Sequence, residues 1–170
     1  MRRFRRRPVR PMHEPYHPFH RPHHPDPPAP LPLPNNYKDH GGHPYVVDID
    51  QATKANPNYR TTLWTGKHLQ ITLMSIPPGG DIGLEIHPDN DQFLRIEQGQ
   101  GIVQMGKTEK KLSFRQTAFE DYAILVPAGT WHNITNIGDT PLKLYSIYAP
   151  PHHPPGTVHA TKAIAEAEED

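Results

Sequence analysis

Short strand-like runs separated by turn residues are the feature that most narrows what this chain can fold into. From Arg60 onward, runs rich in Val, Ile, Leu, Thr and aromatic residues recur about every ten residues, with Gly, Pro, Asn or Asp between them. No long helical period interrupts the series. We therefore expect an all-β sandwich or barrel, with strands at 60–65, 69–76, 82–87, 92–97, 102–105, 123–126, 131–135 and 142–148.

Three smaller elements flank this series. Tyr45–Ile49 has the composition of a short strand. Asp50 is placed to cap a brief helix through Ala55, which Asn56 and Pro57 would end. The C-terminal residues 161–170 are rich in Ala and Glu, and they predict either a frayed helix or an acidic tail.

Proline divides the chain into regions. Residues 1–44 hold 12 of the 22 prolines and 7 of the 13 histidines. Proline removes amide donors and fixes φ, and this stretch has few aliphatic side chains with which to build a core. We therefore predict a disordered Pro/His/Arg-rich arm at 1–44, a barrel at 45–155 and an acidic C-terminal tail at 156–170.

The net charge of zero hides an asymmetry between these regions. Residues 1–44 carry 8 Lys/Arg against 3 Asp/Glu, a net charge of +5, and the remainder carries 10 against 15, a net charge of −5. A basic arm of this kind can contact nucleic acid or an anionic surface, but a solvated arm is the simpler interpretation, and we favour it. The arm histidines would collect transition metals only loosely: His13, His17, His20, His23 and His24.

Several classes of protein are excluded or disfavoured. No run of about 18 apolar residues exists, so we expect no membrane-spanning helix. The basic residues 1–10 are not followed by an apolar segment, which argues against a secretory signal. With no cysteine there is no disulfide or thiolate metal site. A cytoplasmic location is the default expectation, with association with spores as the alternative.

Four polar residues are the candidate site. Glu85 and His87 stand two apart on an expected strand, so their side chains share a face. Gln92 would lie opposite them if the next strand presents its Gln92, Leu94 and Ile96 face inward. His132 follows a Pro-x-Gly turn and supplies a second imidazole. Asp91 is the alternative to Gln92 as a ligand. If Asp91 faced the site, the alternation would also turn Phe93, Arg95 and Glu97 toward it.

Two histidines and one carboxylate are the ligand set that suits Fe(II) in non-haem oxygenases, and they also hold Mn, Co, Ni or Zn. Each residue taken alone has a simpler explanation. A single histidine near a strand end more often makes a hydrogen bond, and a glutamate often faces solvent. Spacing therefore leaves a metal site and a set of ordinary polar residues as alternatives.

The first of two segments resembles a motif of the cupin superfamily, GxxxxxHxHxxx(x)ExxxxxxG. Gly79, His87 and Gly99 match its fixed positions. Glu85 stands where the first histidine is usual, and Gln92 stands where glutamate is usual.

The second segment is similar to the other cupin motif, GxxxxxPxGxxHxxxN. Pro127, Gly129, His132 and Asn136 match it, and Asp121 replaces its leading glycine. The resemblance covers about residues 60–150. It implies a double-stranded β-helix, or jelly roll, with one divalent transition metal held by His87, His132 and Glu85, and by Gln92 as a weaker neutral ligand.

The resemblance also implies a range of functions. Small cupins of this kind are often named mannose-6-phosphate-isomerase-like, which suggests a metal-dependent isomerase acting on a small polar, sugar- or acid-like molecule. A non-haem dioxygenase and a non-catalytic binding or structural module, such as one in a spore-coat-like assembly, remain alternatives. Small cupins commonly pair, so we expect a homodimer, with apolar contacts from Phe93 and Ile86 or Trp131.

Two further features of the strands bear on the site. The last strand presents inward either Leu144, Ser146 and Tyr148 or the alternate set, and the sequence does not decide between them. Glu97 is a candidate general base, but its position in the alternation favours the outer surface of its strand.

Overall fold

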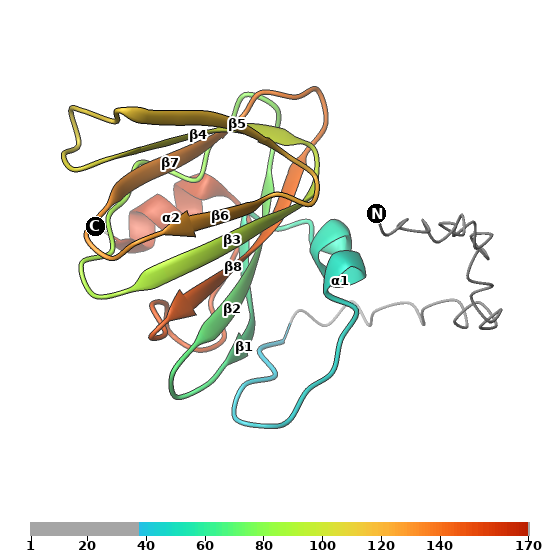
Figure 1. Cartoon of the computed structure of the whole chain (residues 1–170). Coiled ribbons are helices and arrows are strands. Elements are labelled where there is room, and N and C mark those ends of the chain that lie inside the picture. Colours follow the sequence, from blue (N-terminus) through green and yellow to red (C-terminus); the bar gives the residue numbers. More distant parts are fainter. Residues whose placement is uncertain (1–37, 170) are drawn as a thin grey trace, which may run out of the picture. The chain divides into compact units, whose positions relative to one another are not determined.

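The computed structural model describes residues 38–169, so most of the expected arm lies outside the described residues. Within this range the strands form two antiparallel sheets that face each other (Figure 1). The larger sheet has the order β6 (Ala123–Val126), β3 (Asp91–Gln98), β8 (Leu142–Ala149), β2 (Gln70–Ile76), β1 (Arg60–Thr65) and β9 (Val158–His159). The smaller sheet has the order β5 (Phe114–Phe119), β4 (Gln100–Gly106) and β7 (Trp131–Asn136).

The core lies between the two sheets. Leu94, Ile96 and Leu144 enter it from the larger sheet, and Val103 and Ile134 enter it from the smaller one, all at most 3% exposed. Alternation of buried and half-buried positions along β4 and β7 follows the two-residue period of a strand. The expected all-β double-stranded β-helix is confirmed.

The helix α1 (Ile49–Ala55) packs on the outer face of the larger sheet. Its Ala52 joins a second apolar cluster with Leu63 and Leu73. The cap is Asp48, whose side chain accepts a hydrogen bond from the Gln51 amide at 3.0 Å. Two expectations are therefore wrong: Asp50 is inside the helix, and the stretch at 45–49 forms no strand because Asp48 begins the helix there.

Two differences concern the strands. The expected strand at 82–87 is a loop that touches β7 through single bridges, Asp81 with Thr135 and Glu85 with His132. Gly83, with φ of 87°, interrupts the extended backbone between those two bridges. The strand β5 has no counterpart in the expected series, because its exposed side chains give little apolar alternation.

The C-terminal stretch adds a strand and a helix to the barrel. The strand β9 pairs with β1, and α2 (Lys162–Glu169) follows it. Ala165 of α2 is 2% exposed and joins the main core. Of the two forms expected for residues 161–170, the helix is therefore the one observed. Neither described helix has the length and apolar character that a membrane span needs.

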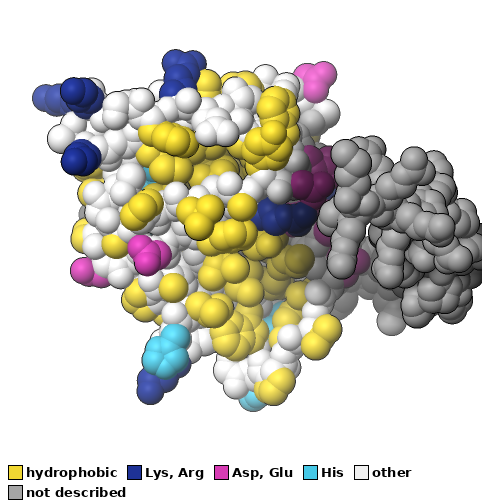
Figure 2. Space-filling view, viewed as in Figure 1, with side chains coloured by type: hydrophobic (Ala, Val, Ile, Leu, Met, Phe, Trp, Pro, Cys, Tyr) yellow, Lys and Arg dark blue, Asp and Glu magenta, His cyan; other side chains and the backbone are white. Residues whose placement is uncertain are grey.

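Apolar side chains also gather on the outside of the larger sheet, over β6, β3 and β8 (Figure 2). Leu125 is 69% exposed there. Phe93, Leu125 and Ile147 line a shallow groove on this face of about 410 Å³.

Candidate metal centre

Two backbone hydrogen bonds bring the site together. The Glu85 amide donates to the His132 carbonyl at 3.1 Å, and the His132 amide donates to the Glu85 carbonyl at 2.9 Å. Glu85 and His132 are thereby direct antiparallel neighbours, and His87 lies two residues beyond Glu85. In addition, the Gly129 amide donates to the His87 carbonyl at 2.9 Å. The three side chains consequently project to the same side.

The three side chains converge on one point. Glu85 Oε1 lies 3.2 Å from His87 Nε2 and 3.3 Å from His132 Nε2. One donor atom from each residue lies within 4.8 Å of the other two. His87 and His132 are 4% and 1% exposed. Neither Nε2 atom makes a hydrogen bond, although both are buried. Buried polar atoms without partners are rare, so this arrangement fits a cation at the centre of the three donors.

His132 is held in the tautomer that a metal requires. Its Nδ1 lies 3.0 Å from the Thr130 carbonyl oxygen. A carbonyl only accepts hydrogen bonds, so Nδ1 carries a proton, and Nε2, which faces Glu85 and His87, is the nitrogen left to bind a metal. An outer partner of this kind orients most metal-binding histidines.

Charge around Glu85 favours the ionised carboxylate. Burial raises the pKa of Glu85, but contacts with the His132 and His87 imidazoles, together with their charge, lower that pKa by more, and the net shift is well below the ordinary range. The guanidinium of Arg60 lies 4.0 Å from Glu85 Oε2. Glu85 therefore offers an anionic oxygen to any cation that the imidazoles face.

Gln92 faces inward, as the alternation predicted, and Asp91 does not. Gln92 is 3% exposed, and its Nε2 donates to Ser146 Oγ at 2.8 Å. Its Oε1 is buried and has no hydrogen-bond partner. Asp91 is exposed and accepts from the Ala128 amide at 2.9 Å. The role of Gln92 as a ligand stays a prediction, while its position relative to Asp91 is settled by the structure.

The inward set on β8 is Leu144, Ser146 and Tyr148. Each of the three is fully buried. The Tyr148 ring packs edge-on against His87, with ring centroids 5.4 Å apart. The strand β8 thus contributes an aromatic wall to the site.

Sequence reasoning missed two histidines beside the site, His152 and His153. The His152 ring lies 4.2 Å from the His87 ring. Gln70 fixes this segment, since its Oε1 accepts from the His153 amide at 2.9 Å and its Nε2 donates to the His153 carbonyl at 2.9 Å. Burial lowers the pKa of His153 to about 2, helped by the charge of Arg60. The available signal was the position of the His-His pair, which follows β8 after two prolines.

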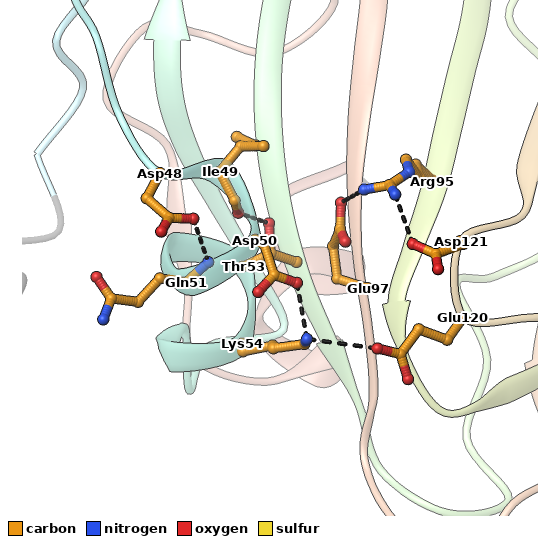
Figure 3. A network of polar contacts seen from close by, with 10 residues as sticks. All are labelled: Asp48, Ile49, Asp50, Gln51, Thr53, Lys54, Arg95, Glu97, Glu120 and Asp121. Atoms are coloured by element: carbon orange, nitrogen blue, oxygen red, sulfur yellow. Dashed lines mark hydrogen bonds and ion pairs between the residues drawn. The ribbon is translucent and has the colours of Figure 1, made fainter. Parts of the chain in front are cut away.

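Glu97 lies outside the barrel interior, in a network of polar contacts between α1 and β3 (Figure 3). It is 2% exposed and pairs with Arg95, which also bonds Asp121 at 2.6 Å. Burial raises the pKa of Glu97, and Arg95 lowers it by less. Its outward position agrees with the alternation, but α1 covers it.

The residues that match the two sequence motifs have structural roles as well. Gly99 and Gly129 adopt left-handed φ values of 89° and 72°. Asp121, which replaces the leading glycine of the second motif, also has a positive φ of 70°. Aspartate tolerates this conformation better than most residues. Asn136 is 1% exposed and donates from Nδ2 to the Ile76 carbonyl at 2.9 Å and the Thr140 carbonyl at 2.8 Å.

Comparison with known proteins agrees with this fold and motif pattern. Residues 72–148 match the family model described as a cupin domain. The YrkC protein of Bacillus subtilis strain 168 is 66% identical over 133 residues, which are 78% of this chain and 72% of that protein. The L612 protein of Acanthamoeba polyphaga mimivirus is 47% identical over 115 residues, which are 67% of this chain and 70% of that protein.

A solved structure extends the likeness to three dimensions. The crystal structure of BH2720 from Bacillus halodurans is 65% identical and superposes with a TM-score of 0.76. The match covers 76% of this chain and 98% of that one. Both cupin motifs, the facing antiparallel sheets and these relatives lead to one conclusion: the chain belongs to the cupin family.

Proposed function

We propose that Glu85, His87 and His132 bind one divalent transition metal, and that the protein uses this ion to act on a small polar molecule that is sugar- or acid-like. The single observation that carries the proposal is the convergence of two buried, unpartnered Nε2 atoms on one carboxylate oxygen. Iron, manganese, nickel, cobalt and zinc all accept this donor set.

The donor set also fixes the charge of the loaded site. One carboxylate and two neutral imidazoles leave a divalent ion with a charge of about +1, and such an ion supplies Lewis-acid polarisation of a carbonyl or enediolate oxygen. The side chains and backbone around the site orient the groups that would face the ion. Thr130 holds the His132 ring, and Gln92 directs its unpartnered Oε1 into the buried interior. Tyr148 packs against the His87 ring, and Gln70 holds the segment that carries His153 beside the site.

Isomerisation of the mannose-6-phosphate-isomerase-like kind is the activity proposed first. It requires a side chain that moves a proton. His153 has an unpartnered Nε2 near the site, but burial holds its pKa at about 2, so it is a poor base at neutral pH. Glu97 faces away from the interior. Neither His153 nor Glu97 is therefore suited to move a proton at the site, which supports the second candidate, a non-catalytic module that holds a metal without turnover. The two-histidine, one-carboxylate set supports a non-haem dioxygenase as a third.

The homodimer and the cytoplasmic location are also parts of this proposal. The outer groove beside Phe93 supports pairing, because an exposed apolar sheet face is stabilised by a partner. Ile86 and Trp131 are only partly exposed, so Leu125 adds more apolar surface than either. Light scattering at micromolar concentration tests the dimer, and a monomer mass would contradict it.

Metal stoichiometry of the full chain, produced without an affinity tag, tests the metal site. Elemental analysis of the wild type and of the double variant His87→Ala, His132→Ala is expected to differ by one equivalent, because each substitution deletes a strong donor. The arm histidines are the same in both proteins and cancel in the comparison. Gln92→Ala removes only a neutral oxygen, so it is expected to weaken binding modestly.

A matched control uses an exposed histidine. His68→Ala changes a histidine in the turn between β1 and β2 and leaves the site intact, so it is expected to keep the full equivalent. If the double variant retained one tightly bound equivalent, the assignment to Glu85, His87 and His132 would be wrong.

A further inference from the structure

A cavity of about 560 Å³ opens at the side of the barrel between β5 and β6. These two strands are the edge strands of the two sheets, and in the described part of the chain they do not pair with each other. The barrel is therefore open along this side. A volume in this range accommodates a small organic molecule.

The inner wall of the cavity is apolar. Val103, Met105, Ala118 and Ile124 line it, and each is 9% exposed or less. The β4–β5 register sets Met105 opposite Phe114, so Phe114 shares this inward face. Phe114 is nevertheless 49% exposed, because no strand covers it from the other sheet. A large inward-facing aromatic side chain left in contact with solvent indicates space for an apolar ligand.

The rim of the cavity carries one cation, and further basic residues lie in the hairpin beside it. Lys107 lines it, at the start of the turn that joins β4 to β5. Lys110, Lys111 and Arg115 follow in the same hairpin, with Glu109 as its acidic residue. None of these four cations forms an ion pair with another described residue. A group of dark blue side chains lies at the upper left of the molecule in Figure 2, where Figure 1 places the β4–β5 hairpin. This rim favours an anion.

The cavity borders the metal centre. Met105 is the cross-strand neighbour of His132 in the β4–β7 pair. Thr130, which also lines the cavity, holds the His132 ring through its carbonyl oxygen. Gly129 lines it too and donates its amide to the His87 carbonyl. A molecule in the cavity therefore contacts the backbone that positions both imidazoles.

We propose that this cavity binds a small organic anion with an apolar body, such as a medium-chain carboxylate, with the body against Met105 and Ala118 and the anionic group at Lys107. That the ligand is the substrate of the metal centre rests on the function proposed above. The inference then narrows the sugar- or acid-like class to acids that carry an aliphatic or aromatic portion.

Isothermal titration of the full chain with three probes tests both halves of the ligand. Octanoate carries the apolar body and the anion, 1-octanol carries only the body, and acetate carries only the anion. Octanoate is expected to bind with one equivalent and more tightly than 1-octanol, and acetate is expected to show no saturable binding. Equal binding of octanoate and 1-octanol would overturn the anionic half, and no binding of octanoate would overturn the whole.

Variants locate the binding. Ala118→Leu fills part of the cavity at its inner wall, and we expect about tenfold weaker octanoate binding, since the added side chain occupies space that the apolar chain of octanoate would otherwise fill. Phe114→Ala removes a wall on the half-exposed side, where folding tolerates it, and is expected to weaken octanoate binding as well. Unchanged affinity in both variants, each with the wild-type melting temperature, would place the octanoate elsewhere.

The charge test has a matched control on the same hairpin. Lys107→Ala is expected to weaken octanoate binding about threefold and to leave 1-octanol binding unchanged, in keeping with the strength of an exposed ion pair. Lys110→Ala removes the same charge from a residue that does not line the cavity, and is expected to have a smaller effect. Equal losses in the two variants would show a general field effect and contradict a contact at Lys107.

Metal analysis of the same samples separates this inference from the proposed function. Octanoate binding without a bound metal would support the cavity and contradict the metal centre. One equivalent of metal without octanoate binding would support the metal centre and contradict the cavity as a binding site. A dimer that becomes monomeric and gains octanoate binding in Leu125→Glu would show that a second copy covers the cavity, and this outcome would also overturn the inference.

Discussion

Glu85 and Glu97 are enclosed glutamates on opposite sides of one β-layer, and their surroundings shift their pKa values in opposite directions. Glu85 faces two imidazoles inside the barrel, and its pKa is lowered despite burial. Glu97 lies under α1 beside Arg95, and its pKa is raised because burial outweighs the guanidinium (Figure 3). The comparison teaches that enclosure alone does not decide the charge of a carboxylate. The number and placement of the polar groups that face it decide that charge.

Metal binding gives the largest expected difference between the two glutamates. Glu85→Gln removes the anionic donor, and we expect the affinity for a divalent metal to fall by more than about 100-fold. This loss exceeds the loss expected when a residue that only hydrogen-bonds a metal ligand is removed. Glu97→Gln makes the same chemical change outside the barrel and is expected to leave the affinity unchanged. Competition with a chromophoric chelator measures both. Equal losses would mean that the metal is not bound at Glu85.

The pairing of Arg95 with Glu97 gives the next largest expected effect, and it tests whether Glu97 is charged in the folded state. Arg95→Met leaves Glu97 buried without its cation, and we expect the free energy of unfolding to fall by about 2 kcal/mol. Arg95→Met combined with Glu97→Gln removes the unpaired charge and is expected to recover most of that loss. Urea denaturation measures all three variants, and a double variant no more stable than Arg95→Met would show that Glu97 carries no charge in the folded state.

Asp121 sharpens the outer side of the comparison, because it combines an ion pair with a left-handed backbone. Asp121→Gly loses the contact with Arg95 but suits the φ of 70°. Asp121→Ala loses the same contact and adds strain, so we expect it to be less stable than Asp121→Gly by about 1 kcal/mol. Thermal and urea unfolding of the two variants isolate the backbone contribution, and equal stabilities would refute it.

The smallest expected effect is a difference in pH dependence between the two glutamates, measured on metal-free protein. The folded-state pKa of Glu85 is lowered, so its contribution to stability is present above its ordinary value of 4.5 and is lost as pH falls below it. The folded-state pKa of Glu97 is raised, so its contribution is present below 4.5 and is lost as pH rises. Glu85→Gln and Glu97→Gln are expected to change the slope of unfolding free energy against pH in opposite directions. Slopes of the same sign would contradict the comparison.

Alternation predicted most of the site because its residues obey a two-residue period even where the regular strand is absent. Glu85 and His87 share a face although residues 81–87 form a loop, since one bridge to β7 holds Glu85 extended. The same reasoning separated Gln92 from Asp91 correctly. On β8 the period was equally clear, but both alternate sets contain apolar and polar side chains, so only the fold could choose Tyr148.

The features that could not be predicted depend on contacts between distant parts of the chain. The strand β5 escaped notice because Gln116 on its inward face and Phe119 on its outward face break the apolar alternation. His152 and His153 lie in a proline-rich stretch that is typical of a turn, and it is Gln70 on β2 that fixes them beside His87. The cap of α1 required a choice between Asp48 and Asp50, and local sequence permits both.

The pair of backbone hydrogen bonds between Glu85 and His132 has a consequence for how the molecule responds to its ion. These two bonds join a loop to a strand of the smaller sheet, and the third donor lies on the same loop. An ion that ligates all three residues would link the loop to β7 across this seam. The unfolded chain does not hold the three donors together, so the ion would bind the folded chain preferentially. Loading would then be linked to conformational stability, adding about 2.7 kcal/mol when the free ion is at 100 times its dissociation constant. The seam at residues 81–87 would be protected from hydrogen exchange in the loaded protein and would open first when the ion is withdrawn.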